Sequence, residues 1–599
     1  MQQKLTPKET YTHYLELYTS TLKKLKKKRS NIGWLRLLIV LAVLFLIYSM
    51  FFKLSAVAVA LVVVGIATFL HVISIDAGNN EKIAETERLV EINKGELSTL
   101  SGNYSNRDDG ASFMPAQHPY AGDIDLFGKA SLYQYLNRCT SQQSTQLLAT
   151  ALLQPAPPGV IIDRQEAAQS LSNNVEWRQK LQSSGMADSL TFQTENKIKA
   201  WLQMAEPLQQ SFWKIIPPLF TTITLFTVAA FLLDWISSAV FWMLVFVYFL
   251  VAKYTSGKVI ETYTALTKVE GEIETIYKQL QLIEELPAVN GKLLNSYKRI
   301  LVTEKKGTDG IKSLKEILKK FDFRLNLLVF MVLNTFFLWD VRQTLHLNKW
   351  KKEFASSVPA WFEILANIEL VSTLATLTFN HPDWIFPTVV HDHLTLSGEQ
   401  MGHPLIKENK RVNNSFSTTG TGKISIITGS NMAGKSTFLR SIAISLVLAQ
   451  SGAPVCAAAF TFSPVRLYSS MRISDNLAEN TSTFYAELKK LKSIIEQVKQ
   501  HERVFILLDE ILRGTNSLDR HTGSEALIRQ LIRDQAVAVI ATHDVELGNL
   551  QNEFKEEIDN YHFDVQVEGE ELYFDYKLKR GICQSLNAFL LMKKIGIEI

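Results

Sequence analysis

Four long apolar stretches interrupt the mixed polar and apolar pattern of the chain. Leu54 to Ile75, Ile215 to Leu233 and Trp235 to Ala252 contain no Asp, Glu, Lys or Arg. A fourth stretch, Trp34 to Phe52, contains only Arg36 near its start, where a long side chain can reach the lipid headgroups. Each stretch has about the length that a helix needs to cross roughly 30 Å of hydrocarbon. The pattern predicts four transmembrane helices, paired into two hairpins.

The charges at the ends of these stretches predict the topology. Each hairpin has a very short connection, in which the only charge is Lys53 or Asp234. The basic residues at the opposite ends are Lys23 to Arg29, Lys197, Lys199, Lys214, Lys253 and Lys258. Because cytoplasmic segments beside membrane helices are rich in Lys and Arg, we expect a multi-pass protein of the inner or plasma membrane with both termini in the cytoplasm.

A further apolar segment, Leu325 to Trp339, is shorter and is interrupted by Asn326 and Asn334. We expect it to form a buried or interfacial helix rather than a fifth span. A fifth span would also place the C-terminal part of the chain outside the cytoplasm.

The length and composition predict several domains, with part of the chain embedded in lipid. The 599 residues are 47% hydrophobic and 20% charged, with a net charge of +4, which is apolar for a soluble protein. The cations of Lys23 to Arg29 indicate either a topology signal with anionic-lipid contact or a DNA-binding arm, and we favour the first. Cys139, Cys456 and Cys583 are isolated, so they indicate neither a disulfide framework nor a metal site built from cysteines.

A glycine-rich loop in the last third of the chain has the most specific chemistry. Lys423 to Thr428 predicts a buried strand, and an apolar helix is expected from the end of the loop to about Leu448. The loop is a complete Walker A motif, and the residues expected to bind ATP are Gly429, Ser430, Asn431, Met432, Ala433, Gly434, Lys435, Ser436 and Thr437. Backbone N–H groups of such a loop hold phosphate oxygens, Lys435 reaches the β- and γ-phosphates, and Ser436 binds Mg²⁺.

Two further strands end in residues that fit ATP hydrolysis. Arg503 to Glu510 predicts an apolar strand that ends in two carboxylates, as in a Walker B motif. We expect Asp509 to hold Mg²⁺ through water and Glu510 to orient or deprotonate the attacking water. His543 follows a third apolar strand, Ala536 to Ala541, and is placed to sense the γ-phosphate. The three motifs together predict an ATPase.

These motifs resemble those of the MutS family of DNA mismatch repair proteins. The resemblance rests on TGSNMAGKST in the Walker A motif, Arg513-Gly-Thr after the Walker B motif, Ser482-Thr-Phe with Glu487, and Tyr576-Lys-Leu. It implies a C-terminal α/β P-loop ATPase domain of the ABC/MutS type that forms a homodimer. It also implies that the catalytic Ser482 of one subunit approaches the nucleotide of the other.

The resemblance extends upstream over fewer residues. Gly402-His-Pro-Leu resembles the lead-in to the family's ATPase domain, and positions between Leu136 and Gln165 resemble the start of its all-α core. The expected organisation is a basic cytoplasmic tail (1–32), transmembrane hairpin 1 (33–75), a linker with the first part of the core (76–214), transmembrane hairpin 2 (215–253), the rest of the core as a lever (254–395) and the cytoplasmic ATPase domain (396–599).

Kinship with this family implies binding to mismatched DNA and mismatch repair. The family's mismatch-recognition module would need a far longer segment before Leu126 than the tail, two membrane helices and short polar linker found there. We therefore expect the module to be absent and any DNA binding to be weak and non-specific.

Two other functions stay open. An ABC-transporter half would share an ATPase and membrane helices, but the chain has no Leu-Ser-Gly-Gly-Gln before the Walker B motif and only four expected spans. The other is a nucleotide-gated scaffold that acts on a membrane partner. In the preferred mechanism, ATP closes two nucleotide domains on each other, and hydrolysis reopens them and moves the helical core with its hairpins.

Overall fold

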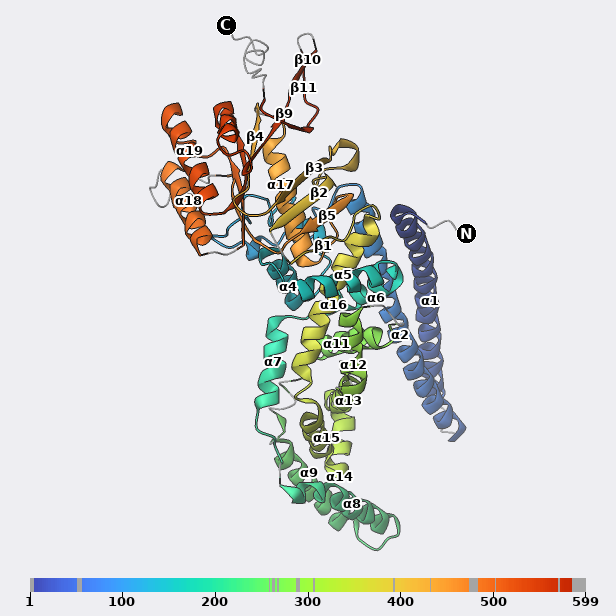
Figure 1. Ribbon diagram of the computed structural model, residues 1–599. Coiled ribbons are helices and arrows are strands. Elements are labelled where there is room, and N and C mark those ends of the chain that lie inside the picture. Colours follow the sequence, from blue (N-terminus) through green and yellow to red (C-terminus); the bar gives the residue numbers. More distant parts are fainter. Residues whose placement is uncertain are drawn as a thin grey trace.

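The chain divides into a helical N-terminal region and a C-terminal region built on β-sheets (Figure 1). The computed structural model describes residues 5–50, 56–208, 210–257, 259–260, 264, 266, 269–286, 291–304, 307–391, 394–430, 432–472, 483–500, 503–568 and 571–583. Within these ranges no strand precedes Thr388. The expected order of a mostly helical region with apolar helices and an α/β region is confirmed.

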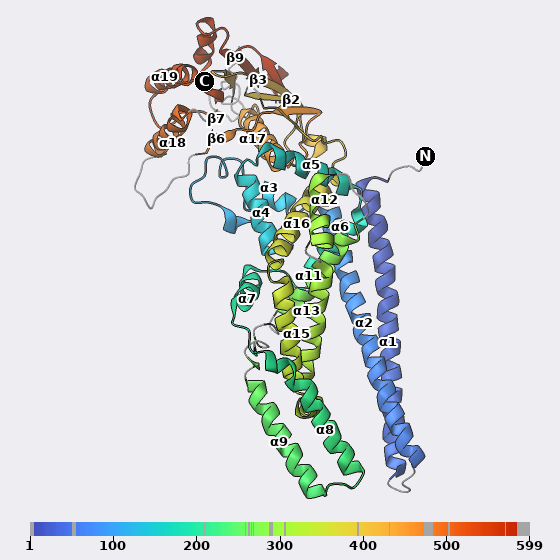
Figure 2. The same cartoon turned by 60° about the horizontal axis from the view of Figure 1, so that its bottom comes forward.

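Two very long helices, α1 (Pro7–Met50) and α2 (Ala56–Leu100), form an antiparallel hairpin along one side of the molecule (Figure 2). Residues 7–32, which were expected to form a tail, belong to α1, and α2 includes much of the expected polar linker. The polar parts of the two helices pair with each other, as where Arg36 Nη1 lies 2.7 Å from Asp76 Oδ2. This pairing explains why the helices continue beyond their apolar ends.

A second apolar hairpin consists of α8 (Ile216–Leu232) and α9 (Ser238–Gly257). Thr227 Oγ1 and Tyr248 Oη lie 2.7 Å apart across it, while most of its large apolar side chains are exposed. Figures 1 and 2 show this hairpin at the same end of the molecule as the apolar ends of α1 and α2, with the β-sheets at the opposite end.

By length and composition alone, four described helices are able to cross a membrane: α1, α2, α9 and α16 (Val358–Asn380). They differ in burial. Inside the protein, 78% of the apolar stretch of α16 is buried, compared with 6% for α1, 6% for α2 and 22% for α9. Helix α16 is therefore a core helix, and α8 is a shorter apolar helix beside α9.

Helix α16 forms the centre of the helical core (Figure 2). The other helices of this region are α3 (Leu132–Leu136), α4 (Gln142–Leu153), α5 (Pro158–Ser172), α6 (Val175–Gly185), α7 (Phe192–Gln203), α11 (Glu270–Glu284), α12 (Lys292–Arg299), α13 (Gly307–Phe321), α14 (Leu327–Phe337) and α15 (Trp339–Phe354). Buried Glu369 of α16 accepts hydrogen bonds from the Thr140 and Ser141 backbone N–H groups at 2.9 and 3.1 Å. It thereby fixes the start of α4 against α16.

The α/β region contains a six-stranded sheet of order β12-β9-β4-β8-β7-β6, in which only β12 is antiparallel. Its strands are β4 (Ile424–Gly429), β6 (Arg466–Ser470), β7 (Val504–Asp509), β8 (Val537–Thr542), β9 (Ile558–Phe563) and β12 (Leu578–Arg580). A second sheet of order β1-β5-β2-β3 contains β1 (Thr388–Val389), β2 (Thr395–Met401), β3 (Asn414–Thr419) and β5 (Ala459–Phe462), and β10 (Gln566–Glu568) pairs with β11 (Glu571–Tyr573). The three strands expected around the nucleotide motifs are confirmed as β4, β7 and β8.

The faces of the large sheet pack against different helices, which are α17 (Lys435–Ser451), α18 (Thr483–Lys499) and α19 (Ser517–Arg533). Ile424 and Ile426 of β4 lie in a cluster with α18 and α19, whereas Ile427 belongs to the core that includes α17. This alternation is the period of two expected for a strand covered on both faces. Helix α17 also contacts α4 and α5, so it lies between the sheet and the helical core.

A buried ion network joins the first hairpin to the core. Glu96 of α2 lies 2.9 Å from Arg138 and 2.8 Å from Arg107, and it accepts a hydrogen bond from Asn380 at 2.9 Å. The Tyr11 hydroxyl of α1 donates to Asn380 Oδ1 at 2.8 Å. Burial would raise the pKa of Glu96, but the two guanidinium groups hold it well below its usual range. The network fixes both helices of the hairpin to the end of α16.

Replacing the buried carboxylate, Glu96→Gln, is expected to destabilise this junction by about 3–5 kcal/mol, because two buried guanidinium groups lose their counter-charge. The measurement is the thermal unfolding of the full chain in detergent. Glu87→Gln is the control, since its exposed carboxylate lies 2.7 Å from Lys26 and such pairs contribute at most about 1 kcal/mol. Equal effects of the two substitutions would contradict the prediction.

Candidate nucleotide-binding site

The loop between β4 and α17 has backbone conformations that favour glycine at two positions. Gly429 and Gly434 have φ angles of 150° and 106°. A Cβ on Gly429 would lie 2.8 Å from the Phe563 carbonyl oxygen. The loop therefore turns tightly from the end of β4 into α17, whose first N–H groups have no acceptor within the helix. This geometry is suited to an anion.

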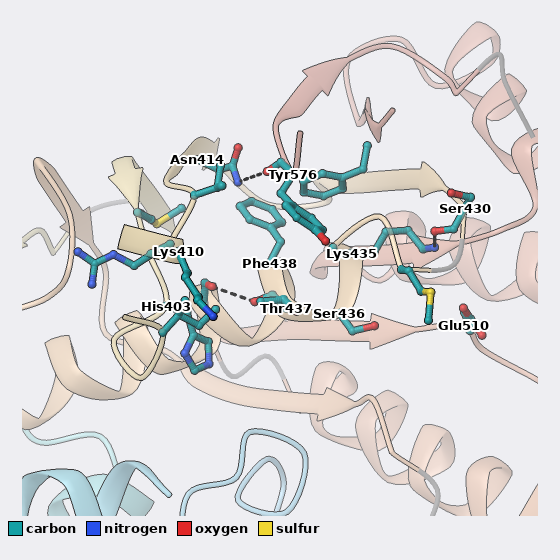
Figure 3. A pocket seen from close by; sticks show the side chains of 18 residues that line it. His403, Lys410, Asn414, Ser430, Lys435, Ser436, Thr437, Phe438, Glu510 and Tyr576 are labelled. Atoms are coloured by element: carbon teal, nitrogen blue, oxygen red, sulfur yellow. Dashed lines mark hydrogen bonds between the residues drawn. The ribbon is translucent and has the colours of Figure 1, made fainter. Parts of the chain in front are cut away.

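The Lys435 side chain is buried and folds back onto this loop (Figure 3). Its Nζ donates to the carbonyl oxygens of Gly429 and Ser430 at 2.8 and 3.0 Å and lies 3.4 Å from His543 Nδ1. Burial lowers the pKa of Lys435, and the nearby carboxylates offset only part of this shift. A phosphate oxygen would be a stronger partner for this ammonium group than the two neutral carbonyls.

Asp509, at the end of β7, has a carboxylate oxygen available for a cation. Its Oδ1 is buried and has no hydrogen-bond partner among the residues that the structure describes. Burial raises the pKa of Asp509, and a hydrogen bond from the Ser436 hydroxyl offsets only part of this shift. A carboxylate beside a hydroxyl at the start of a helix is an oxygen donor set that Mg²⁺ accepts.

Glu510 and His543, which the sequence suggested for separate tasks, contact each other. The Glu510 carboxylate lies against His543 Nε2, and its other oxygen is 3.1 Å from Arg513 Nε. The hydrogen bond from His543 lowers the pKa of Glu510. The carboxylate therefore stays ionised at pH values below those at which a Glu usually titrates. Glu510 also has a φ of 50°, and its N–H donates to the Ala541 carbonyl oxygen at 2.8 Å. The order of the strands explains this contact, because β7 and β8 are neighbours.

Two of the expected site residues, Ser482 and Asn431, lie outside the described residues. Helix α18 begins directly after Ser482 and is attached to the loop that follows β7. Glu487 of α18 is buried, and its Oε1 accepts a hydrogen bond from the Leu512 N–H at 2.6 Å. Met432 is 77% exposed at the rim of the loop.

A cavity of about 420 Å³ opens beside the loop. The expected site residues that line it are Ser430, Met432, Gly434, Lys435, Ser436, Thr437 and Glu510. Gly429, Asp509 and His543 lie behind this lining and are linked to it by the contacts of Lys435 and Glu510. Ala433 is buried and is not part of the lining.

The other half of the cavity contains residues to which the sequence analysis gave no role at the site. They include His403, Lys410, Asn414, Phe438 and Tyr576 (Figure 3). Burial lowers the pKa of His403 to about 4, so its ring is neutral near pH 7. This half provides rings and apolar atoms beside the phosphate-binding loop, as a nucleoside would require.

Tyr576 is held in a left-handed conformation, with a φ of 52°. Asn414 fixes this turn, because its Nδ2 donates to the Tyr576 carbonyl oxygen at 3.0 Å and its Oδ1 accepts from the Leu578 N–H at 2.8 Å. The Tyr576 ring lies so close to Gly434 that a Cβ there would be 3.1 Å from it. No sequence pattern places these two segments together, which explains why the contribution of Tyr576 to the pocket was not predicted.

Comparison with known proteins places the α/β region in a family. Residues 425–596 match the family described as MutS domain V. The chain is 33% identical over 235 residues to the DNA mismatch repair protein MutS of Persephonella marina, covering 39% of this chain and 26% of that protein. It is 32% identical over 204 residues to MutS protein homolog 4 of Mus musculus, covering 32% and 21%. These matches support membership of the MutS family through the α/β region. The chain spans less than a third of the length of these curated relatives.

The MutS domain V match contains the whole sequence from the phosphate-binding loop to His543, and it also contains Tyr576. It begins inside β4, so Asn414 and Lys410 on the other side of the cavity precede it. The helical region and both apolar hairpins also precede the matched residues. The MutS relationship therefore concerns the half of the molecule that contains the candidate site.

Removing the ring over the loop, Tyr576→Ala, is expected to weaken nucleotide binding by about 1–3 kcal/mol, the usual loss when an aromatic ring that stacks on a base is truncated. Tyr576→Phe is the matched control and should retain the affinity, because stacking needs the ring and not the hydroxyl. Equilibrium titration with a fluorescent ATP analogue measures both. Equal weakening by the two substitutions would show that the hydroxyl, rather than stacking, matters.

Proposed function

We propose that this chain is a membrane-anchored ATPase of the MutS family, in which ATP binding and hydrolysis drive a conformational switch. The observation that carries the proposal is the convergence of Lys435, Asp509, Glu510 and His543 at one end of the β4–β8–β7 sheet, beside a cavity of about 420 Å³. In open parallel sheets, ligands bind at the carboxyl ends of the strands.

The residues present fit ATP and Mg²⁺. The loop and the start of α17 offer N–H groups and the Lys435 ammonium to the phosphates, and the unpartnered Asp509 oxygen with Ser436 offers ligands to the metal. Bound Mg²⁺ would neutralise charge on the phosphates. Glu510 would orient the attacking water once its contact with His543 opens, and His543 would then be free to face the γ-phosphate.

A homodimer would complete the site. Apolar side chains are exposed around the cavity and on the neighbouring helices α18 and α19: Met432 is 77% exposed, Tyr485 61% and Leu518 73%. A contiguous apolar surface marks an interaction site in soluble domains, and the dimer proposal expects these three side chains to contribute to one. In the proposed dimer, these side chains lie between two α/β regions, and Ser482 of one subunit acts on the nucleotide of the other.

Two observations support anchoring in the inner or plasma membrane. The apolar ends of both hairpins lie at one end of the molecule, opposite the nucleotide site (Figures 1 and 2). The cations of Lys23 to Arg29 are exposed on α1, directly before its apolar part, where they can contact anionic headgroups. In the proposed orientation, the nucleotide site and both chain termini lie in the cytoplasm.

The catalytic proposal separates binding from hydrolysis. Glu510→Gln is expected to bind ATP·Mg²⁺ but to hydrolyse it at least about 100-fold more slowly, because the amide keeps the shape and removes the base. Lys435→Ala should lose binding itself. Equilibrium nucleotide binding and steady-state turnover, measured on the full chain in detergent, distinguish the two. Near-normal turnover of Glu510→Gln would remove Glu510 from the catalytic role.

DNA binding is a second candidate function, because the curated relatives are DNA mismatch repair proteins. The described elements before Leu132 are α1, α2 and one short 3₁₀ turn, which form a hairpin and a connection rather than a separate domain. The remaining source of affinity is contact of basic residues with phosphates, which contains no information on mismatches.

We therefore expect weak, salt-sensitive binding to duplex DNA with little preference for a mismatch. Replacing the exposed Lys27, Lys28 and Arg29 together by Gln should reduce it, because fewer counterions are then released. Titration of homoduplex and single-mismatch duplex at two salt concentrations measures both effects. A salt-resistant preference of roughly tenfold for the mismatch, about 1.4 kcal/mol, would contradict the expectation and restore a repair function.

A further inference from the structure

Helix α14 exposes a large apolar surface. Leu325, directly before it, is 81% exposed, and Leu327 and Leu328 in its first turn are 68% and 77% exposed. Val329, Met331 and Val332 are exposed as well. The sequence from 325 to 339 contains no Asp, Glu, Lys or Arg. A continuous apolar surface of this size marks contact with another apolar phase.

The opposite end of α14 is attached to the second hairpin. Asn334 and Thr335 are buried, and Asn334 Nδ2 donates to the Ala252 carbonyl oxygen of α9 at 3.4 Å. Thr224 of α8 donates through its hydroxyl to the Phe336 carbonyl oxygen at 2.7 Å. Asn334 Nδ2 and the Phe336 carbonyl oxygen are thus used toward α9 and α8, and the exposed apolar side chains of α14 continue the apolar surface of that hairpin.

Polar residues flank α14 on both sides. Arg324 lies 3.4 Å from buried Asp340 and donates to Ser256 Oγ at 3.0 Å, at the end of α9. Arg342 donates to the Pro217 carbonyl oxygen at 3.0 Å, at the start of α8. With 11 residues, α14 is about 16 Å long, too short to cross roughly 30 Å of hydrocarbon. The chain therefore leaves α14 on the side from which it entered.

We propose that α14 contacts the acyl chains of the bilayer, as a third membrane element beside α8 and α9. The proposal rests on the membrane anchoring proposed above for that hairpin. Lipid is the occupant that fits best, because the exposed face is continuous with the hairpin surface that includes Phe226 and Phe246. Trp339, at the start of α15, donates to the Lys320 carbonyl oxygen at 2.7 Å, and aromatic side chains are enriched at the headgroup level.

This placement gives the lever a direct membrane contact. Helix α14 connects α13 to α15, and α15 is followed by α16, whose other end meets Glu96 and the β-sheets. A movement of α16 driven from the nucleotide site would shift α14 and the α8–α9 hairpin together. The second membrane module is then a three-helix unit at the tip of the lever rather than a passive anchor.

Spin-label accessibility in lipid nanodiscs tests the proposal on the full chain. Single cysteines are introduced by Leu328→Cys, with Met331→Cys as a second site, Phe246→Cys on α9 as the lipid reference and Lys320→Cys as the water reference. The labelled unsubstituted chain is the blank, because Cys456 and Cys583 are buried and burial raises the pKa of the half-buried Cys139 thiol to about 12.

Labels at 328 and 331 should match the label at 246, with a ratio of oxygen to nickel-chelate accessibility at least about fivefold above that at 320, since the charged chelate is excluded from hydrocarbon. A ratio equal to that at 320, with 246 in lipid, overturns the inference and leaves the anchoring intact. Low access to both reagents with broadening that disappears on dilution with unlabelled chain indicates a second copy instead of lipid, and also overturns it. Water access at 246 removes the membrane anchoring itself.

Discussion

Helix α17 is packed on both of its faces, and this constraint joins the candidate nucleotide cavity to the rest of the molecule. From Ser441 to Ser451 every residue is buried, on one side by the large sheet and on the other by α4 and α5. Two hydrogen bonds to backbone carbonyl groups at the end of α17 stabilise its contact with the helical core. The Arg164 side chain donates to the Ser451 carbonyl oxygen at 3.3 Å, and the Ala156 N–H donates to the Gln450 carbonyl oxygen at 3.3 Å. Because close-packed interiors deform little, a displacement of the loop before α17 would move the helical core with it.

The two hairpins are connected to this core by different chemistry. The first is fixed by buried charge at the end of α16, where the Asn380 side chain donates to Glu96. The next residue, His381, stacks on Trp384, with their ring centroids 4.0 Å apart. Burial lowers the pKa of His381 to about 4, so this ring adds no charge near Glu96 at neutral pH. The second hairpin is reached through the other end of α16, by way of α15 and α14. Helix α16, together with α15 and α14, therefore separates the attachment points of the two hairpins.

The sequence predicted the features that depend on local pattern. Uncharged stretches identified both hairpins, and the nucleotide motifs identified β4, β7 and β8 together with the loop before α17, because such a loop needs a strand before it and a helix after it. The helical extension of α1 and α2 was not predicted, since their polar parts are stabilised by pairs such as Arg36 with Asp76, 40 positions apart. The position of Tyr576 was missed for the same reason, because Asn414, which fixes it, is 162 positions away.

The contact between Glu510 and His543 gives the proposed switch a physical basis. His543 Nδ1 lies 2.9 Å from the Gly429 carbonyl oxygen, which also accepts from the Lys435 ammonium at 2.8 Å. The two side chains therefore meet at one carbonyl group, at the point where β4 enters the loop before α17. An anion in that loop is a stronger partner for Lys435 than a neutral carbonyl, and its arrival changes the environment of His543 at the same time. In the proposed mechanism, binding of the phosphates and release of Glu510 would thereby be coupled through the Gly429 carbonyl group.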